Sequence, residues 1–138
     1  MLRMLPLPLI FAAFSIRMLY NGRHPIVLAA FWVLVLTSVG LPLLWESRIR
    51  GMRIARSFLF SGAAMNATVV MANGGMPVLH PYHSLPNGIW IPVSEHTRLL
   101  FLGGIHFGGF SVGDMFILVG LLAGASIALF NANRGQTP

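Results

Sequence analysis

Two methionines and two histidines stand close together in the stretch MANGGMPVLHPYH, which covers residues 71 to 83. Thioether and imidazole groups bind copper, and imidazole also binds haem iron or the magnesium of a chlorophyll. The spacing matches no zinc or haem signature, and methionine is also an ordinary apolar side chain. The sequence therefore requires no cofactor, although it offers candidate ligands. The candidate metal ligands are Met71, Met76, His80 and His83, and the candidate haem or pigment ligands are His80, His83, His96 and His106.

Carboxylates are the second kind of side chain that could carry chemistry, and the chain has only three of them. Aspartic intramembrane peptidases use two acids that share a proton. Here only Glu95 and Asp114 fall in the second half, and Arg98 is an ion-pair partner for either of them. No serine, lysine or histidine pattern indicates another nucleophile. We therefore expect a protein that is not an enzyme, and an intramembrane hydrolase has little support.

Helix ends explain Asp114 and the glycine pair at 74–75 without any ligand. Ser111 and Asp114 have the spacing of a capping box, with the carboxylate near the positive end of the helix dipole. The Asn-Gly-Gly sequence at 73–75 is typical of a helix C-terminus, where glycine takes the left-handed conformation, and Pro77 prevents the helix from continuing. The residues given these structural roles are Asn73, Gly74, Gly75, Ser111 and Asp114.

Composition decides which elements must position these residues. The chain has 138 residues, of which 56% are hydrophobic and 9% are charged, whereas about a quarter of the residues in a soluble protein are charged. The absence of cysteine excludes disulfides and thiolate chemistry. These features predict an all-α integral membrane protein that forms a single transmembrane domain over residues 1–138.

Four apolar segments predict four transmembrane helices, at about 5–20, 26–44, 54–72 and 112–130. The last three are long enough to cross about 30 Å of hydrocarbon at 1.5 Å per residue. The first is shorter, and its Arg17 would reach the membrane interface by snorkelling. Residues 73–110 form an extracytoplasmic cap between the third and fourth helices. In the cap, an Asn-Gly turn at 87–88 with strand-like residues on both sides predicts a small hairpin.

Arginine placement predicts the orientation in the membrane. The loop WESRIRGMRIAR is rich in arginine, and such short loops stay on the cytoplasmic side. Both chain ends then also lie in the cytoplasm, and the expected location is a bacterial inner membrane. Six arginines and Glu46 give +5 inside, and three arginines and two acids give +1 outside, which recovers the net charge of +6. This asymmetry explains the high pI without a nucleic-acid partner.

Small residues predict that the third and fourth helices pack closely. Gly120 and Gly124 form a G-x-x-x-G pair, and the third helix has a small-residue side at Ser61–Ala64 and Ala67. Such residues let helix backbones approach each other in a membrane. Asn66 is expected to hydrogen-bond across the contact. The spacing leaves open whether the partner helix belongs to this chain or to another protein.

Three motifs of the second half also resemble a known family. Asn-Gly-Gly-Met-Pro-Val falls on 73–78, Thr-Arg-Leu-x-Phe-Leu-Gly on 97–103, and Ser-Val-Gly-Asp on 111–114. In order and spacing they resemble a family of small polytopic bacterial membrane proteins known as domain of unknown function 5317, over Gly62 to Gly120. Gly104 stands where the family has an aspartate, which removes a partner for Arg98. The resemblance implies the membrane architecture and no particular reaction.

We expect from these observations a non-catalytic accessory or scaffold subunit of a larger membrane complex. Few ionisable residues are left for chemistry, and two helices have small-residue faces. Respiratory or photosynthetic complexes are considered first, by analogy, because they contain small helical subunits. The expected partners are membrane lipid and other membrane-protein subunits, with no nucleic acid.

Two alternatives remain from the sequence. The first is a stand-alone membrane protein whose outer loop binds a metal, haem or pigment through the histidines named above. The second is a transporter, which would need polar residues inside the spans. Asn66 is the main residue of that kind, so the sequence favours the accessory subunit.

Overall fold

The computed structural model describes residues 6–19, 25–43, 50–79, 90–104 and 110–134. Most of these residues are helical, and a two-stranded sheet lies between the third and fourth helices. The elements, in chain order, are α1 (Pro6–Leu19), α2 (Pro25–Gly40), the 3-10 helix η2 (Leu41–Leu43), α3 (Arg50–Asn73), β1 (Met76–Val78), β2 (Trp90–Pro92), the 3-10 helix η4 (Leu100–Leu102) and α4 (Val112–Asn133).

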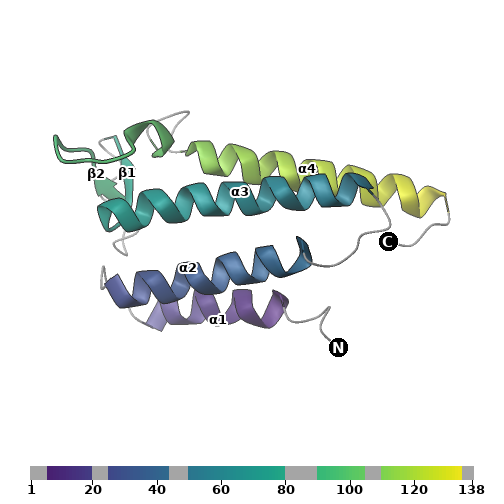
Figure 1. Ribbon diagram of the computed structural model, residues 1–138, viewed down its shortest axis with the longest axis horizontal. Coiled ribbons are helices and arrows are strands. Elements are labelled where there is room, and N and C mark those ends of the chain that lie inside the picture. Colours follow the sequence, from purple (N-terminus) through teal and green to yellow (C-terminus); the bar gives the residue numbers. More distant parts are fainter. Residues whose placement is uncertain (1–5, 20–24, 44–49, 80–89, 105–109, 135–138) are drawn as a thin grey trace.

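The four α-helices run up and down along one long axis (Figure 1). Helices α3 and α4 lie side by side, α1 packs on α2, and α2 packs on α3. The start of α1 and the end of α4 lie at the same end of the molecule, and the strands and η4 lie at the other end. The cap therefore lies at the end of the molecule opposite to the start of α1 and the end of α4.

Helix length separates the two pairs of helices. Among the described residues, Gly51–Asn73 of α3 and Val112–Asn133 of α4 are long and apolar enough to cross a membrane. Helices α1 and α2 have 14 and 16 residues, which is shorter than a full span. Helix α2 ends at Gly40 and continues as the 3-10 helix η2, because Pro42 has no backbone N–H to extend the α-helical hydrogen bonds. The structure confirms four helices, but among the described residues two of them have spanning length, so four transmembrane helices stay a prediction.

The described part of the cap contains the small sheet. Strands β1 and β2 pair in parallel, with Met76 opposite Trp90 and Val78 opposite Pro92. The sequence predicted a strand near residue 90, but it did not predict β1 as its parallel partner. The predicted Asn-Gly turn at 87–88 lies outside the described residues, so the hairpin stays a prediction.

The apolar core lies where α2, α3 and the cap meet. Val69 of α3 and Val78 of β1 are fully buried. The cap is therefore packed against the helices and is not a separate loop. The core cluster consists of Leu28, Val69, Val70 and Met76, with Trp32, Trp90, Leu99 and Leu102 packed against it.

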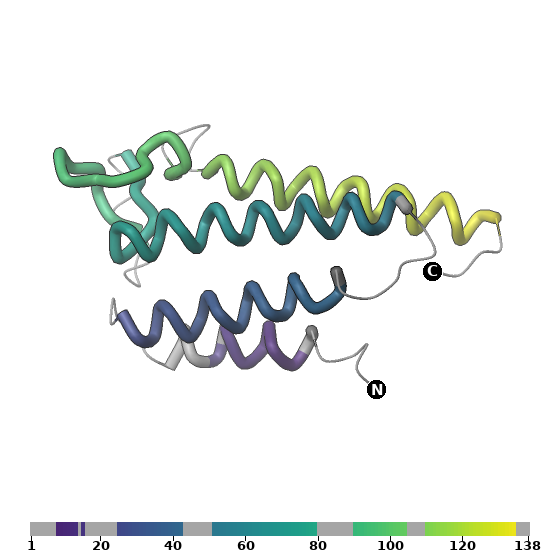
Figure 2. The backbone as a smooth tube through the Cα atoms, in the orientation of Figure 1, coloured from purple at the N-terminus to yellow at the C-terminus, as the bar shows by residue number. Residues whose placement is uncertain are grey.

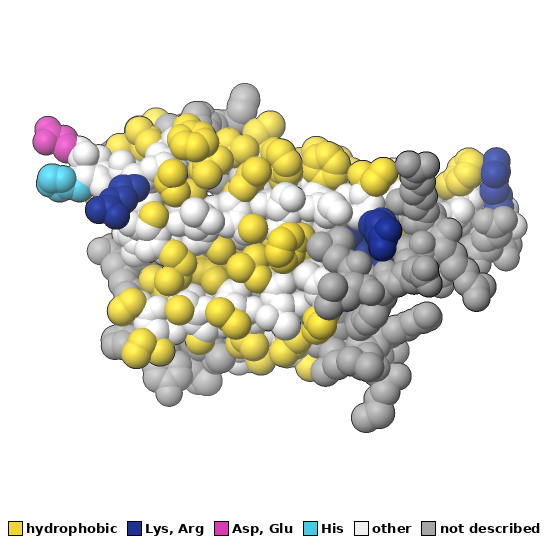
Figure 3. All heavy atoms as spheres, viewed as in Figure 1, with side chains coloured by type: hydrophobic (Ala, Val, Ile, Leu, Met, Phe, Trp, Pro, Cys, Tyr) yellow, Lys and Arg dark blue, Asp and Glu magenta, His cyan; other side chains and the backbone are white. Residues whose placement is uncertain are grey.

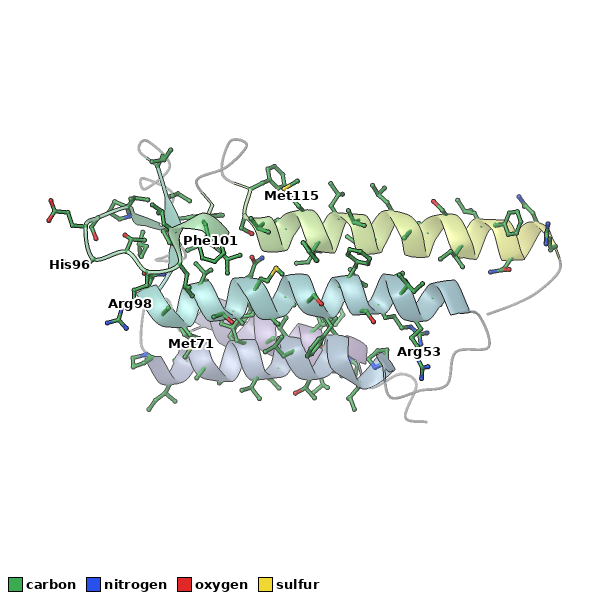
Figure 4. The ribbon with its side chains drawn as sticks, turned by 45° about the horizontal axis from the view of Figure 1, so that its top comes forward. Arg53, Met71, His96, Arg98, Phe101 and Met115 are labelled. Carbon is green, nitrogen blue, oxygen red and sulfur yellow. The ribbon has the colours of Figure 1, made fainter. Side chains whose placement is uncertain are left out.

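Charged and apolar side chains occupy different parts of the surface (Figure 3). On the face that Figure 3 shows, charged side chains lie toward the two ends of the long axis, and apolar side chains cover much of the length between them. Arg53 lies at one end, and His96 and Arg98 lie at the cap end (Figure 4). Helix α4 is the more exposed of the two long helices. Of the residues in its most apolar stretch, 11% are buried, compared with 39% in α3.

Candidate functional site

Three polar side chains join α3 to the start of α4, and we call them the Asn66 network: Asn66, Ser111 and Asp114. The Asn66 amide Nδ2 donates to Asp114 Oδ1 at 2.7 Å, and the Ser111 hydroxyl donates to Asn66 Oδ1 at 2.6 Å. Within α4, the backbone N–H of Asp114 donates to Ser111 Oγ at 3.0 Å, and the backbone N–H of Ser111 donates to Asp114 Oδ2 at 2.9 Å. The network is a closed ring of hydrogen bonds.

The last two of these bonds form the capping box that the sequence predicts at the start of α4. Ser111 has an extended backbone and accepts from the third helical residue, as an N-cap residue does. The bonds from Asn66 extend this local motif to the neighbouring helix. Asn66 therefore bonds across the helix contact, as expected, and its partners belong to the same chain.

Glycines allow the two helices to come close enough for these bonds. A Cβ atom added to Gly113 would overlap the Asn66 side chain and lie 2.6 Å from the Gly62 carbonyl oxygen. A Cβ atom at Gly120 would lie 2.8 Å from the Ala55 carbonyl oxygen. At Gly124 the nearest atom is 3.7 Å away, which is ordinary contact. Gly120 thus makes the predicted close contact, and Gly124 lies beside a looser part of the interface.

The Asn66 network joins α3 to the start of α4, and its polar groups are used for this contact. Asn66 is 6% exposed and Ser111 is fully buried. Both carboxylate oxygens of Asp114 accept hydrogen bonds from the chain itself. Glu95, the other acid among the described residues, is exposed in a turn of the cap. The described residues therefore do not place two acids together, as a shared-proton mechanism requires.

Asn73 holds the cap in a similar way. Its Nδ2 donates to the carbonyl oxygen of Arg98 at 2.8 Å, and its Oδ1 accepts from the Arg98 backbone N–H at 2.7 Å. Asn73 is also the last residue of α3, and Gly74 follows with a φ of 72°, so the predicted helix end is confirmed. Sequence reasoning missed the contact with Arg98, because the two residues are far apart in the chain. The Arg98 side chain is exposed. Gly75, which follows Gly74 at the end of α3, is buried.

Leu99, which follows Arg98, has a left-handed backbone with a φ of 54°. A left-handed backbone is unfavourable for leucine, and the paired bonds from Asn73 to Arg98 together with the packing of Leu99 on the core offset this cost. The start of η4 is therefore held to the end of α3.

The candidate ligands lie in different environments. Met76 is 5% exposed and belongs to the apolar core, whereas Met71 is 46% exposed on α3. His96 is exposed at the outermost turn of the cap (Figure 4). His80, His83 and His106 lie outside the described residues, so ligand binding stays a prediction. Within the described ranges, no group of three or more His, Asp or Glu side chains could hold a metal ion.

Arg56 makes a contact that sequence reasoning missed. Its Nη1 donates to the carbonyl oxygen of Pro42 at 3.0 Å, which joins α3 to the end of η2. Carbonyl oxygens at the end of a helix lack partners within the helix, and a cation nearby is favourable. Arg56 was assigned only to the predicted membrane orientation, and it also holds the end of the α2–η2 segment.

No family model, no curated protein and no solved structure matches this chain. The resemblance noted in the sequence therefore stays a prediction. The function proposed below rests on the arrangement of the helices, the Asn66 network and the cap.

Proposed function

We propose that this protein is an integral protein of a bacterial inner membrane and serves as a non-catalytic accessory or scaffold subunit of a larger membrane complex. The observation that carries the proposal is the use of the polar side chains. Asn66, Ser111 and Asp114 bond to one another inside the chain, while large apolar side chains of α4 point outward. Such a chain offers contact surface and little reactive chemistry.

The membrane location is supported by the length and surface of α3 and α4. Each has an apolar stretch of spanning length. The charged side chains visible in Figure 3 lie toward the two ends of the molecule, while Asp114 is held by hydrogen bonds within the chain.

Helix α2 with η2 runs beside the α3 segment between Val70 and Arg56. Leu28 packs with Val69 and Val70 at one end of this segment, and Pro42 accepts a hydrogen bond from Arg56 at the other end. Several polar side chains bond to carbonyl oxygens of their own helix, among them Thr37, Ser38, Thr68 and Asn131. This removes free polar groups from an apolar environment.

The proposed orientation places the Arg53 end of the molecule in the cytoplasm. Arg53, Arg56 and Arg134 lie toward this end, and the positive-inside rule assigns it to the cytoplasmic side. The start of α1 and the end of α4 are at the same end. The cap, with Glu95 and His96, then lies outside.

The proposed contact surface for other subunits or lipid is the outward side of α4. Exposed large aliphatic side chains continue along the helix from Met115 to Leu129, and the exposed Phe130 follows them. Respiratory and photosynthetic complexes are named by analogy, because they recruit small helical subunits. The proposal requires no catalytic group from this chain.

Native mass spectrometry of the protein released gently from its own membrane tests the subunit role. We expect it to emerge within a complex that contains other membrane proteins. If it emerges alone or as a homo-oligomer, the subunit role is wrong. Extra mass of a metal, haem or pigment on the isolated chain would support the alternative ligand-binding function.

Labelling of single cysteines tests the orientation cleanly, because the natural chain contains no cysteine. His96→Cys and Arg134→Cys place the thiol at exposed positions on opposite ends. A membrane-impermeant maleimide added to spheroplasts should label the first variant, and it should label the second only after permeabilisation. The reverse pattern would overturn the orientation.

A further inference from the structure

Helices α3 and α4 are offset along their long axes. Asn66 bonds to Asp114, which is in the first turn of α4, yet α3 continues to Asn73. At 1.5 Å per residue this continuation is about 10 Å long. At the other end, a Cβ atom at Gly51 would meet Ile127, and α4 continues past that point. Figure 2 shows both overhangs.

In the proposed orientation, the exposed and charged Arg53 sets the inner edge of the hydrocarbon layer. The exposed Leu129 and Phe130 at the end of α4 reach the headgroup region below it. A hydrocarbon thickness of about 30 Å corresponds to about 20 helical residues. Counted along α3 from Arg53, this distance ends at Asn73, the last residue of the helix. Helix α3 therefore reaches the outer edge of the layer, whereas α4 begins about 10 Å below that edge.

Part of the cap fills this missing length above α4. Phe101 of η4 is 64% exposed, and Phe110, next to the α4 N-cap, is 58% exposed. Large apolar side chains exposed together in water are unusual. The polar turn that carries Glu95 and His96 is further out, and Phe101 lies between His96 and the first turn of α4 (Figure 4).

Several backbone groups in and around η4 are paired inside the chain, which suits an apolar environment. Leu102 N–H donates to Leu99 O at 2.9 Å, Gly103 N–H to Leu100 O at 3.0 Å, and Gly104 N–H to Pro77 O at 2.9 Å. Asn73 binds the Arg98 N–H and carbonyl oxygen just before η4. Non-helical backbone is tolerated at membrane depth where its polar groups are satisfied and packed on protein.

We propose that η4 and Phe110 are embedded in the outer leaflet, where they extend the apolar surface of α4 to the level at which α3 ends. The occupant of this surface is the acyl chains of membrane lipid. Lipid covers this surface in the purified protein, because the surface continues directly into the exposed side chains of α4, starting at Met115, which the proposed location places in the bilayer. The inference rests on the proposed membrane location, and it adds the depth of the cap.

Depth-dependent quenching tests this inference with single cysteines carrying an NBD fluorophore. The variants are Phe101→Cys and Phe110→Cys in the cap, His96→Cys as the aqueous control, and Leu122→Cys as the control on the exposed side of α4. The protein is reconstituted into vesicles of phosphatidylethanolamine and phosphatidylglycerol. The quenchers are aqueous iodide and lipids with a nitroxide at a shallow or a deep position of the acyl chain.

We expect the fluorophores at 101 and 110 to show blue-shifted emission, protection from iodide and quenching by the shallow nitroxide. The fluorophore at 96 should be quenched by iodide. If iodide quenches 101 and 110 as it does 96, the cap lies in water and the inference is wrong. If neither iodide nor lipid nitroxides quench them, a protein surface such as a second copy covers these positions. That result also contradicts the inference.

The Leu122 control separates this inference from the proposed function. A fluorophore at 122 that the deep nitroxide quenches confirms that α4 lies in the bilayer, whatever the result at 101 and 110. If iodide quenches 122 and lipid nitroxides do not, the membrane location itself is wrong, and the cap inference fails with it.

Discussion

The α3–α4 pair and the α1–α2 pair use different kinds of contact. Between α3 and α4, glycines bring the backbones together, and Asn66 bonds to both Ser111 and Asp114. Helices α1 and α2 are shorter, a buried side chain of α1 is the apolar Ala13, and Leu28 of α2 packs on two buried valines of α3. Apolar side chains gain little by leaving lipid for another helix, whereas close backbone approach and hydrogen bonds favour one partner. The α3–α4 pair is therefore the more specific half of the molecule.

The largest effect is expected from Gly113→Ala. The new methyl group overlaps the Asn66 side chain and approaches the Gly62 carbonyl oxygen, so the helices must separate and the Asn66 network must break. We expect a loss of about 2 to 3 kcal/mol in the free energy of unfolding. The measurement is reversible unfolding in mixed detergent micelles, followed by circular dichroism.

Gly124→Ala is the matched control, because it makes the same chemical change in the same helix where the nearest atom is 3.7 Å away. Alanine is the better helix former by up to about 1 kcal/mol, so this variant should be neutral or slightly more stable. Equal losses at 113 and 124 would contradict the role given to close backbone approach.

The second effect is expected from Asn66→Ala. The change leaves the Ser111 hydroxyl and one Asp114 oxygen without their partner from α3. The expected loss is about 1 to 2 kcal/mol, from the lost bonds and the unpaired buried groups. Asn131→Ala is the control, since Asn131 bonds to Ile127 O within its own helix and should matter less. A larger loss at Asn131 would show that the Asn66 network does not hold the pair.

Asp114→Asn should have a smaller effect. The replacement amide keeps an oxygen for the Ser111 N–H, but its NH2 group faces the donating Asn66 NH2, so the Asn66 amide must turn over to accept from it. The charge that is favourable near the helix N-terminus is also lost. We expect a loss of about 1 kcal/mol, with faster amide hydrogen exchange in the first turn of α4. Under the proposed subunit role, the variant should still assemble with its partner subunits. A fully stable protein whose complex had lost activity would instead give Asp114 a functional role.

The smallest effect is expected from Gly40→Ala in α2. The new methyl group would lie 3.1 Å and 3.4 Å from two ring atoms of Phe60, and a side-chain ring can move by a few tenths of an ångström. The free energy of unfolding should change by less than about 0.5 kcal/mol. A loss as large as that at Gly113 would mean that α2 and α3 are matched as closely as α3 and α4.

The sequence predicted the features that depend on neighbours in the chain. The four helices follow from long apolar runs, and the Ser111–Asp114 capping box and the helix end at Asn73 follow from local spacing. The small residues predicted close packing of the third and fourth helices. Helix bounds were less well predicted, since α2 ends at Gly40 and α3 begins at Arg50.

The sequence alone determined that the chain is helical and apolar, where its helices are capped, and which helices have small-residue faces. Only the tertiary structure decided that Asn66 bonds to Asp114, that Asn73 bonds to Arg98, and that β1 pairs in parallel with β2. It also decided that Met76 is core while Met71 is exposed. Caps depend on residues within one turn, whereas these contacts join distant parts of the chain, and an apolar or small-residue face fits several partners equally well.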